Sequence, residues 1–258
     1  MRVISFNCEG LNRARGKGLF GWLADQDADV VCLQDIRETE CSMAEAKYQM
    51  DGYFCYAYYG YNKADRGGTA MYTRQSPKAI INGLGCPEVD ETGRYLQADF
   101  DKMSIVNVYV PEGHDEASQN FKYCFLDAYS HNLNKQRRKR REFIMCGTWN
   151  IAHRNIDIAD WEKAEEVSGF KASERNWMKG LLGDMGFYDA YREVDQEPGK
   201  YSWWQDESLR RDNVGMRIDY QIITAGMRNR VLNGGIYKAQ GFSSHAPVII
   251  DYDWDLST

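Results

Sequence analysis

The feature that most constrains the fold of this chain is a series of short apolar segments distributed along its whole length. Their lengths are typical of β-strands, and turn residues such as Gly67-Gly68 and Asp101-Lys102 separate several of them. Two further stretches, residues 19–23 and 121–133, carry apolar side chains at helical spacing. Strands interspersed with helices predict two packed sheets flanked by helices. The predicted strands cover residues 3–6, 30–33, 53–58, 69–73, 95–100, 104–110, 143–146, 201–204, 218–223, 230–237 and 248–252.

Length and composition favour a single domain over residues 1–258, because no Pro-rich or Ser-rich linker divides the chain. The N-terminal segment enters a strand directly, without the apolar core of a signal peptide. No apolar run approaches the ~20 residues of a membrane span. Seven scattered cysteines without a CxxC pair add to the expectation of a cytoplasmic protein. We expect Cys32, Cys55, Cys124 and Cys146 to be core residues, because their surroundings are apolar.

The charge of the chain is unevenly distributed. A net charge of −6 argues against a protein that coats nucleic acid by bulk charge. One run nevertheless places six cations in seven residues at the end of the predicted helix 121–133. We predict that this run binds RNA or a partner protein, and the alternative is a solvated helix end. The run consists of Lys135, Arg137, Arg138, Lys139, Arg140 and Arg141.

Polar residues collect where the predicted strands end. Taken singly, each of them is most simply a turn residue or a hydrogen-bonded core residue. Their joint occurrence at strand ends indicates a functional site, because loops at strand ends are where sheet proteins place ligand contacts. These residues are Asn7, Gln34, Asp35, Tyr109, Asn150, Asp219 and His245.

Several segments in one order resemble the exonuclease III and abasic endonuclease branch of the endonuclease/exonuclease/phosphatase family. The resemblance runs over almost the whole chain and implies a four-layered α/β sandwich with its site at one end of the two sheets. The segments that carry it are Ser5-Phe6-Asn7, Asp29-Val30-Val31-Cys32-Leu33-Gln34, Tyr109-Val110-Pro111-Glu112-Gly113, Tyr201-Ser202-Trp203-Trp204, residues 212–219 (DNVGMRID) and His245-Ala246-Pro247.

The resemblance also implies roles for the polar residues. Asn7 lies near the metal and the scissile phosphate, and Asp35 takes the place of the metal-binding glutamate. Tyr109 and Asn150 match positions that contact phosphate. Asp219 matches the acid of the Arg-Ile-Asp motif, and His245 matches the histidine that stabilises developing charge.

The chain departs from the family pattern in its proton chemistry. Gly147-Thr148-Trp149-Asn150 has a threonine where the family has an aspartate that activates water, and a hydroxyl is no base near neutral pH. Ser243-Ser244-His245 has a serine where the family has an aspartate, which the resemblance assigns to orienting the histidine. Asp35 is one methylene shorter than the family's glutamate, and Mg²⁺ demands near-ideal geometry.

Within the family, the chain is most similar to the catabolite repression control proteins, through residues 93–102 (GRYLQADFDK) and 135–142 (KQRRKRRE). This resemblance implies a non-enzymatic translational repressor that acts with the RNA chaperone Hfq on A-rich mRNA sites and needs no cofactor. Trp203, Trp204, Tyr58, Tyr59 and Tyr61 are candidates for stacking on bases.

The sequence thus leaves two functions open. The first is the repressor, favoured by Thr148, Ser244 and Asp35, with self-association left undecided. The second is a Mg²⁺-dependent abasic endonuclease or 3′ exonuclease, favoured by Asn7 and the other retained site residues.

Overall fold

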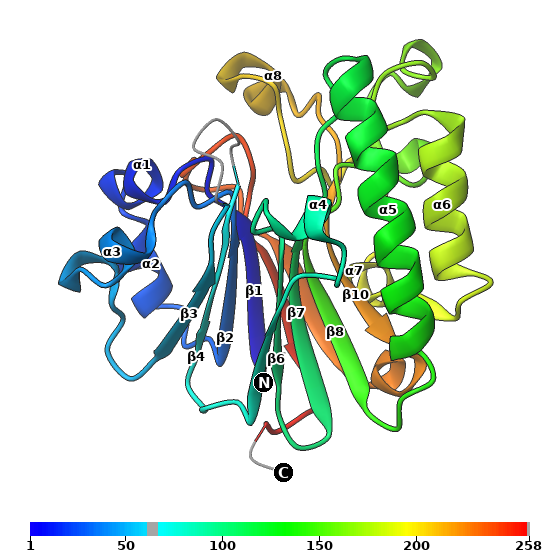
Figure 1. Cartoon of the computed structure of the whole chain (residues 1–258). Coiled ribbons are helices and arrows are strands. Elements are labelled where there is room, and N and C mark those ends of the chain that lie inside the picture. The colour runs from blue at the N-terminus through cyan, green and yellow to red at the C-terminus, as the bar shows by residue number, and fades with distance from the viewer. Residues whose placement is uncertain (61–66, 257–258) are drawn as a thin grey trace.

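Two six-stranded mixed sheets pack face to face in the computed structural model, which describes residues 1–60 and 67–256 (Figure 1). The first sheet has the order β11-β12-β1-β2-β4-β3, and only the pair β1–β2 is parallel. Its strands are β1 (Arg2–Asn7), β2 (Val30–Gln34), β3 (Phe54–Tyr58), β4 (Thr69–Thr73), β11 (Val231–Ile236) and β12 (Val248–Tyr252).

The second sheet has the order β5-β6-β7-β8-β10-β9, and only the pair β7–β8 is parallel. The hairpin expected around Asp101-Lys102 is confirmed as the antiparallel pair β6–β7. The strands are β5 (Ala79–Asn82), β6 (Tyr95–Asp99), β7 (Met103–Tyr109), β8 (Glu142–Thr148), β9 (Phe187–Asp189) and β10 (Asp219–Thr224).

Helices cover the outer face of each sheet and complete four layers, which confirms the predicted α/β sandwich (Figure 1). On the first sheet lie α1 (Leu11–Gly16), α2 (Leu19–Ala24) and α3 (Glu40–Met43). On the second lie α5 (Glu116–Gln136) and α6 (Ala172–Leu182). The shorter helices are α4 (Pro87–Asp90), α7 (Ala190–Val194) and α8 (Glu207–Asp212), with 3-10 turns η1 (Ala46–Tyr48), η2 (Asn155–Asp157), η3 (Trp161–Lys163) and η4 (Ala225–Arg230). Within the described residues, no helix is both long and apolar enough to span a membrane.

Alternation along the central strands explains why most of their residues are apolar. In β8, Ile144 and Cys146 face the first sheet, whereas Phe143 and Met145 pack against α5 and α6. Strands buried on both faces need apolar residues at every position, which is the pattern of the sequence. Gln34 is an exception, because its amide donates to Asn107 Oδ1 at 2.7 Å between the sheets. Gln34 is therefore a buried structural residue.

Helix α5 begins beside one end of the sheets and runs along the second sheet (Figure 1). Its start is fixed by a capping box, in which Asp115 Oδ1 accepts from the Ser118 backbone and the Ser118 hydroxyl accepts from the Asp115 backbone. Phe125, Tyr129 and Leu133 form its buried stripe at intervals of one turn.

Some local expectations were wrong. Residues 201–204 form no strand, and only Trp203 makes isolated bridges, to Met216 and His245. The short edge strands β5 and β9 were not predicted. Cys124 is exposed on α5 rather than in the core.

Candidate active site

Four of the polar residues singled out in the sequence meet at one end of the two sheets. Asn7 ends β1, Thr148 ends β8 and Asp219 begins β10, which runs antiparallel to β8 and so starts where β8 stops. His245 lies just before β12 and joins them. All four side chains are almost completely buried.

A chain of hydrogen bonds links these residues. Asn7 Nδ2 donates to Thr148 Oγ1 at 3.1 Å, and the Thr148 hydroxyl donates to Asp219 Oδ1 at 2.5 Å. The other oxygen of Asp219 accepts from Ser202 Oγ at 2.7 Å and lies 2.9 Å from His245 Nδ1. Both oxygens of Asp219 therefore have partners from this chain, and the carboxylate has little freedom to rotate.

Asp219 is the carboxylate that orients His245. Burial alone would lower the pKa of His245, but the charge and the hydrogen bond of Asp219, with a smaller contribution from Glu9, raise that pKa above its ordinary value. Asp219 therefore favours the charged form of the ring relative to an unpaired buried histidine. The serine at position 244 does not leave His245 without an orienting carboxylate, because Asp219 provides one. The Ser244 backbone N–H donates to Glu9 Oε2 at 2.8 Å.

Asn150 and Tyr109 lie beside this cluster. Asn150 adopts a left-handed backbone conformation with φ of 52°, and its Nδ2 donates to the Val110 carbonyl at 2.8 Å. Tyr109 is buried and directs its hydroxyl to Glu112 Oε1 at 3.3 Å. Burial raises the pKa of Tyr109, so the phenol remains a hydrogen-bond donor at neutral pH.

Asp35 has one committed and one free oxygen. Its Oδ2 accepts from Arg37 Nη2 at 2.5 Å and from Arg37 Nε at 3.0 Å. Its Oδ1 is buried and has no hydrogen-bond partner among the residues that the structure describes. Burial raises the pKa of Asp35, although Arg37 opposes this shift.

The unpartnered oxygen of Asp35 fits a hard divalent cation, which prefers oxygen ligands. Asn7 and Glu9 carry further side-chain oxygens at the same end of the sheets, and Asn7 Oδ1 accepts from the Glu9 backbone N–H at 3.1 Å. Residues 1–60 and 67–256 contain no group of three or more His, Cys, Asp or Glu arranged to hold a metal. A site with so few carboxylates is suitable for Mg²⁺, because this ion keeps several water ligands and often takes its remaining ligands from a substrate phosphate.

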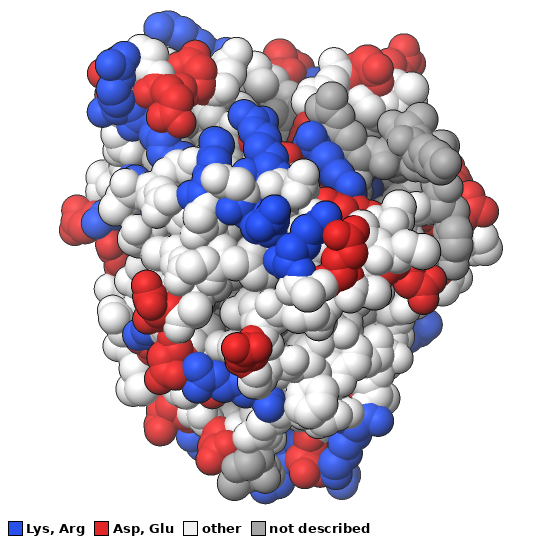
Figure 2. All heavy atoms as spheres, turned by 90° about the vertical axis from the view of Figure 1, so that its left-hand side faces the viewer, with Lys and Arg blue, Asp and Glu red and all other residues white. Residues whose placement is uncertain are grey.

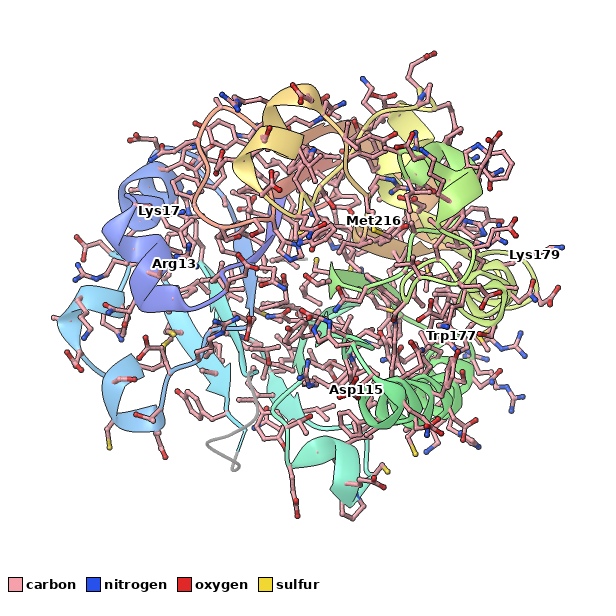
Figure 3. All side chains as sticks on the ribbon, turned by 90° about the horizontal axis from the view of Figure 1, so that it is seen from above. Arg13, Lys17, Asp115, Trp177, Lys179 and Met216 are labelled. Atoms are coloured by element: carbon pink, nitrogen blue, oxygen red, sulfur yellow. The ribbon has the colours of Figure 1, made fainter. Side chains whose placement is uncertain are left out.

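A cavity of about 560 Å³ opens over the cluster. In the view from above (Figure 3), Met216 lies near the middle of the sheet ends, and Asp115 marks the start of α5 at the rim. One side of the cavity is apolar, and the other is polar. The apolar lining consists of Val167, Trp203, Met216 and Ile218, and the polar lining includes Glu9, Glu112, Asn150 and His245.

Sequence reasoning missed two of the carboxylates in this lining. Glu9 follows Asn7 by two residues, and Glu112 lies inside the Tyr109–Gly113 segment that carried the resemblance. Both are acidic residues that closely follow the end of a strand, and this position in the sequence could have identified them as site residues. Of the stacking candidates, Trp203 lines the cavity, Trp204 is buried, and Tyr61 lies outside the described residues.

A buried ion pair supports the polar wall. Lys122 of α5 and Glu174 of α6 are both fully buried, with Nζ and Oε1 2.5 Å apart. Lys122 Nζ also donates to the Asn150 carbonyl at 2.7 Å. Glu174 Oε2 accepts from the Gly169 backbone at 2.7 Å. The pair thus joins two helices to both Asn150 and the Gly169 rim of the cavity.

The basic run lies away from this site. It follows the C-terminal end of α5, whose N-terminal end borders the site, and a 21-residue helix is about 30 Å long. Arg141 is committed to Asp99 at 2.9 Å, and Arg137 Nε donates to Asn134. Arg138, Lys139 and Arg140 are exposed. The role of the run in binding RNA or a partner stays a prediction.

A different basic surface lies next to the site. Figure 2 shows Lys and Arg side chains in the upper half of the face that carries α1–α3. Arg13, Lys17 and Arg210 line a small cavity of about 210 Å³, together with the acidic Asp206 and Glu207 and with Ser243 and Ser244. Arg13 and Lys17 project from the α1 side in the view from above (Figure 3). Positive charge is thus available beside His245 although the chain as a whole is acidic.

Comparisons with known proteins agree with this geometry. A family model described as the endonuclease/exonuclease/phosphatase family matches residues 4–240. The chain is 31% identical to an exodeoxyribonuclease of Bacillus subtilis, over 96% of this chain and 98% of that protein. It is 27% identical to exodeoxyribonuclease III of Haemophilus influenzae, over 98% and 100% of the two chains. A solved structure described as a 3′ phosphatase from Neisseria bound to product DNA hairpin is similar with a TM-score of 0.89 and 26% identity, covering 98% of this chain and 100% of that chain.

Proposed function

Because the chain belongs to the endonuclease/exonuclease/phosphatase family, we propose that it hydrolyses phosphate esters of DNA with a divalent cation, as an exonuclease III-like enzyme for abasic sites or 3′ ends. The observation that carries this proposal is the His245–Asp219 pair at the cavity, close to the unpartnered Oδ1 of Asp35. The nuclease relatives favour this function over the repressor.

His245 is the electrostatic centre of the proposed reaction. Its Nδ1 is held by Asp219, which leaves Nε2 as the ring nitrogen available to a phosphate oxygen in the cavity. A charged imidazole there stabilises the negative charge that develops on a phosphate under attack. Tyr109 remains protonated and adds a neutral donor close by.

Asp35, Asn7 and Glu9 would hold the divalent cation. When bound, such a cation polarises a phosphoryl oxygen and lowers the pKa of a coordinated water. Glu9 is prepared for this role, because the Ser244 N–H bond and the charge of His245 outweigh burial and lower the pKa of its carboxyl group.

The cavity and the basic surface support a DNA substrate. A volume of about 560 Å³ with an apolar wall admits a sugar–phosphate unit that is not stacked in a duplex. Arg13, Lys17 and Arg210 lie where they can contact the adjoining backbone phosphates. The apolar wall formed by Trp203, Met216 and Ile218 suits a sugar that lacks a base or ends a strand.

The test is Mg²⁺-dependent cleavage of an abasic-site duplex and of a duplex with a recessed 3′ end. The wild-type protein should cleave at least one substrate, and His245→Asn should reduce the rate by about 10²–10³-fold, the typical cost of losing a charge-stabilising donor. The matched control is His131→Asn, on the exposed side of α5. Absence of EDTA-sensitive cleavage by both the wild-type protein and the Thr148→Asp variant would overturn the proposal.

A translational repressor remains the second candidate, supported by Thr148 and by the exposed residues of the basic run. Its test is a gel shift with A-rich RNA, using this protein, Hfq, or both. A complex that needs all three components would support the repressor. The variant Arg138→Gln with Arg140→Gln should then weaken the complex, whereas Arg141 is left intact because it pairs with Asp99. No additional shift with Hfq would contradict this hypothesis.

A further inference from the structure

We infer that Glu112 accepts the proton of the attacking water, and so provides the carboxylate that Thr148 does not. This inference rests on the proposed hydrolysis and names a catalytic residue for it. The family pattern places a carboxylate at position 148, whereas Glu112 reaches the same cavity from the loop that follows β7.

The loop of Glu112 is fastened to the strand end that carries Thr148. Tyr109 and Thr148 are opposite one another at the end of the parallel pair β7–β8. The Val110 backbone N–H donates to the Thr148 carbonyl at 2.9 Å, and the Val110 carbonyl accepts from Asn150 Nδ2 at 2.8 Å. Glu112 follows two residues later and lines the cavity with Asn150 and His245. Glu112 therefore borders the same cavity as the residues proposed to contact the phosphate.

The negative charge of Glu112 acts on the groups around it. Burial lowers the pKa of His245, and Glu112 adds to the larger effects of Asp219 and Glu9, which raise it. Glu112 also contributes to the raised pKa values of Asp35 and Tyr109, in which burial is the largest cause. It opposes the fall in the pKa of Lys122 that burial causes. Because Coulomb interactions weaken with distance, these effects place Glu112 within electrostatic reach of His245, Asp35, Tyr109 and Lys122.

The other carboxylates of the site are already committed. Both oxygens of Asp219 accept hydrogen bonds, and Asp35 is buried and paired with Arg37. Glu9 is bound to the Ser244 backbone, and its pKa is lowered, which makes it a weaker proton acceptor.

Glu112 differs from these residues in being both held and accessible. Its side chain is 42% exposed, so water reaches it. The Tyr109 hydroxyl contacts Oε1, and His114 Nε2 pairs with Oε2. Two partners on two oxygens restrict the orientation of the carboxylate, and each oxygen keeps a lone pair that can accept a further proton or hydrogen bond.

The proposed step balances as follows. The water oxygen attacks phosphorus with its lone pair, and one water proton passes to a carboxylate oxygen of Glu112. The bond between phosphorus and the ester oxygen breaks, and its electron pair leaves with that oxygen, which takes a proton from His245 Nε2, and the neutral ring then regains a proton from solvent. Glu112 then returns its proton to solvent. His245 is thus the acid, and Glu112 is the base.

The experiment compares Mg²⁺-dependent cleavage of abasic DNA by wild-type protein, Glu112→Gln, Thr148→Asp, and the double variant. Glu112→Gln should lower kcat by about 10²–10⁴-fold, the usual contribution of a general base. It should not weaken DNA binding. The double variant should cleave at least about tenfold faster than Glu112→Gln alone, because either carboxylate can accept the proton of the same water. The matched control is Glu116→Gln, an exposed carboxylate in the first turn of α5.

Each other outcome has a defined meaning. If the wild-type protein cleaves and Glu112→Gln cleaves equally well, Glu112 only forms a surface ion pair with His114, and the inference falls while the proposed hydrolysis stands. If Glu112→Gln is inactive and Thr148→Asp gives no rescue, Glu112 has another role, and the inference also falls. If the wild-type protein is inactive and Thr148→Asp alone creates cleavage, Glu112 does not replace the missing acid. If none of the four proteins cleaves, the proposed hydrolysis itself is wrong.

Discussion

The hydroxyl of Thr148 lies 2.5 Å from Oδ1 of Asp219 and donates a hydrogen bond to it. A carboxylate at position 148 would place two negative charges in contact unless a cation or a proton lay between them. Threonine replaces that repulsion with a neutral donor, and the same hydroxyl accepts from Asn7 Nδ2. Thr148 therefore gives both Asn7 and Asp219 a hydrogen-bond partner without a cation, but its hydroxyl cannot act as a general base.

Replacing Thr148 by valine should destabilise the fold by roughly 1–3 kcal/mol. The substitution keeps the side-chain shape but leaves Asn7 Nδ2 and Asp219 Oδ1 without this partner in a buried position. Urea unfolding measures the change, and Thr148→Ser, which retains the hydroxyl, is the control. A valine variant that is as stable as the serine variant would show that the two hydrogen bonds contribute nothing net.

Replacing Asp219 by asparagine should lower the pKa of His245, because burial would then act without the charge that opposes it. In the wild-type protein the folded pKa is raised above the unfolded value of about 6.5. Its contribution to stability is therefore complete below that unfolded value and is lost as pH rises through the folded pKa. The measurement is an NMR titration of the His245 ring in both proteins. An unchanged midpoint would mean that Asp219 does not control the protonation of His245.

The collection of site residues at one end of the sheets could be predicted from sequence. Asn7, Thr148 and Asp219 adjoin apolar runs, and β-strands of known direction bring such ends together. The identity of the partner of His245 could not be predicted, because Asp219 lies 26 residues away in the second sheet, whereas His245 precedes β12 of the first sheet, and the two meet only where the sheets pack together. The adjacent Ser244 drew attention because it is close in sequence, whereas its side chain has no part in orienting the ring.

Distance along a helix explains a second difference between sequence and structure. The Glu112 loop precedes α5 and the basic run lies at the other end of the same helix, so only one element separates them along the chain. Helix α5 is straight and about 30 Å long, which puts the run at the far end of the sheets. Apolar periodicity predicted the helix but gave no indication that Lys122 would be buried on its inner side with Glu174.

Acid should unfold the protein partly through Asp157, which is buried under the cavity wall. Burial alone would raise its pKa, but ion pairs with Arg217 at 2.9 Å and Arg192 at 2.6 Å lower it to about 2. Because the folded pKa is depressed, this stabilisation is present above the unfolded value of about 3.9 and is lost as pH falls through about 2. The shift corresponds to about 2 kcal/mol. The expected result is a free energy of unfolding that declines between these two pH values.

The variant Asp157→Asn tests this expectation. It leaves Arg192 without its buried carboxylate partner and Arg217 with only Asp189, so it should cost roughly 3–5 kcal/mol at neutral pH. Its stability should also decline less steeply than that of the wild-type protein between pH 4 and pH 2. Parallel pH profiles for the two proteins would assign the acid sensitivity to other carboxyl groups.

The Lys122–Glu174 pair should show strong non-additivity. Lys122→Met leaves the Glu174 carboxylate buried with neutral donors from Gln119, Ser168, Gly169 and Lys171, and it removes the donor to the Asn150 carbonyl. The single variant should lose about 3–5 kcal/mol, as expected when one partner of a buried pair is removed. In the double variant with Glu174→Gln the loss should be smaller than the sum of the two single losses, because no uncompensated charge remains. Urea unfolding of the four proteins measures the coupling, and strictly additive losses would mean that the two charges do not stabilise one another.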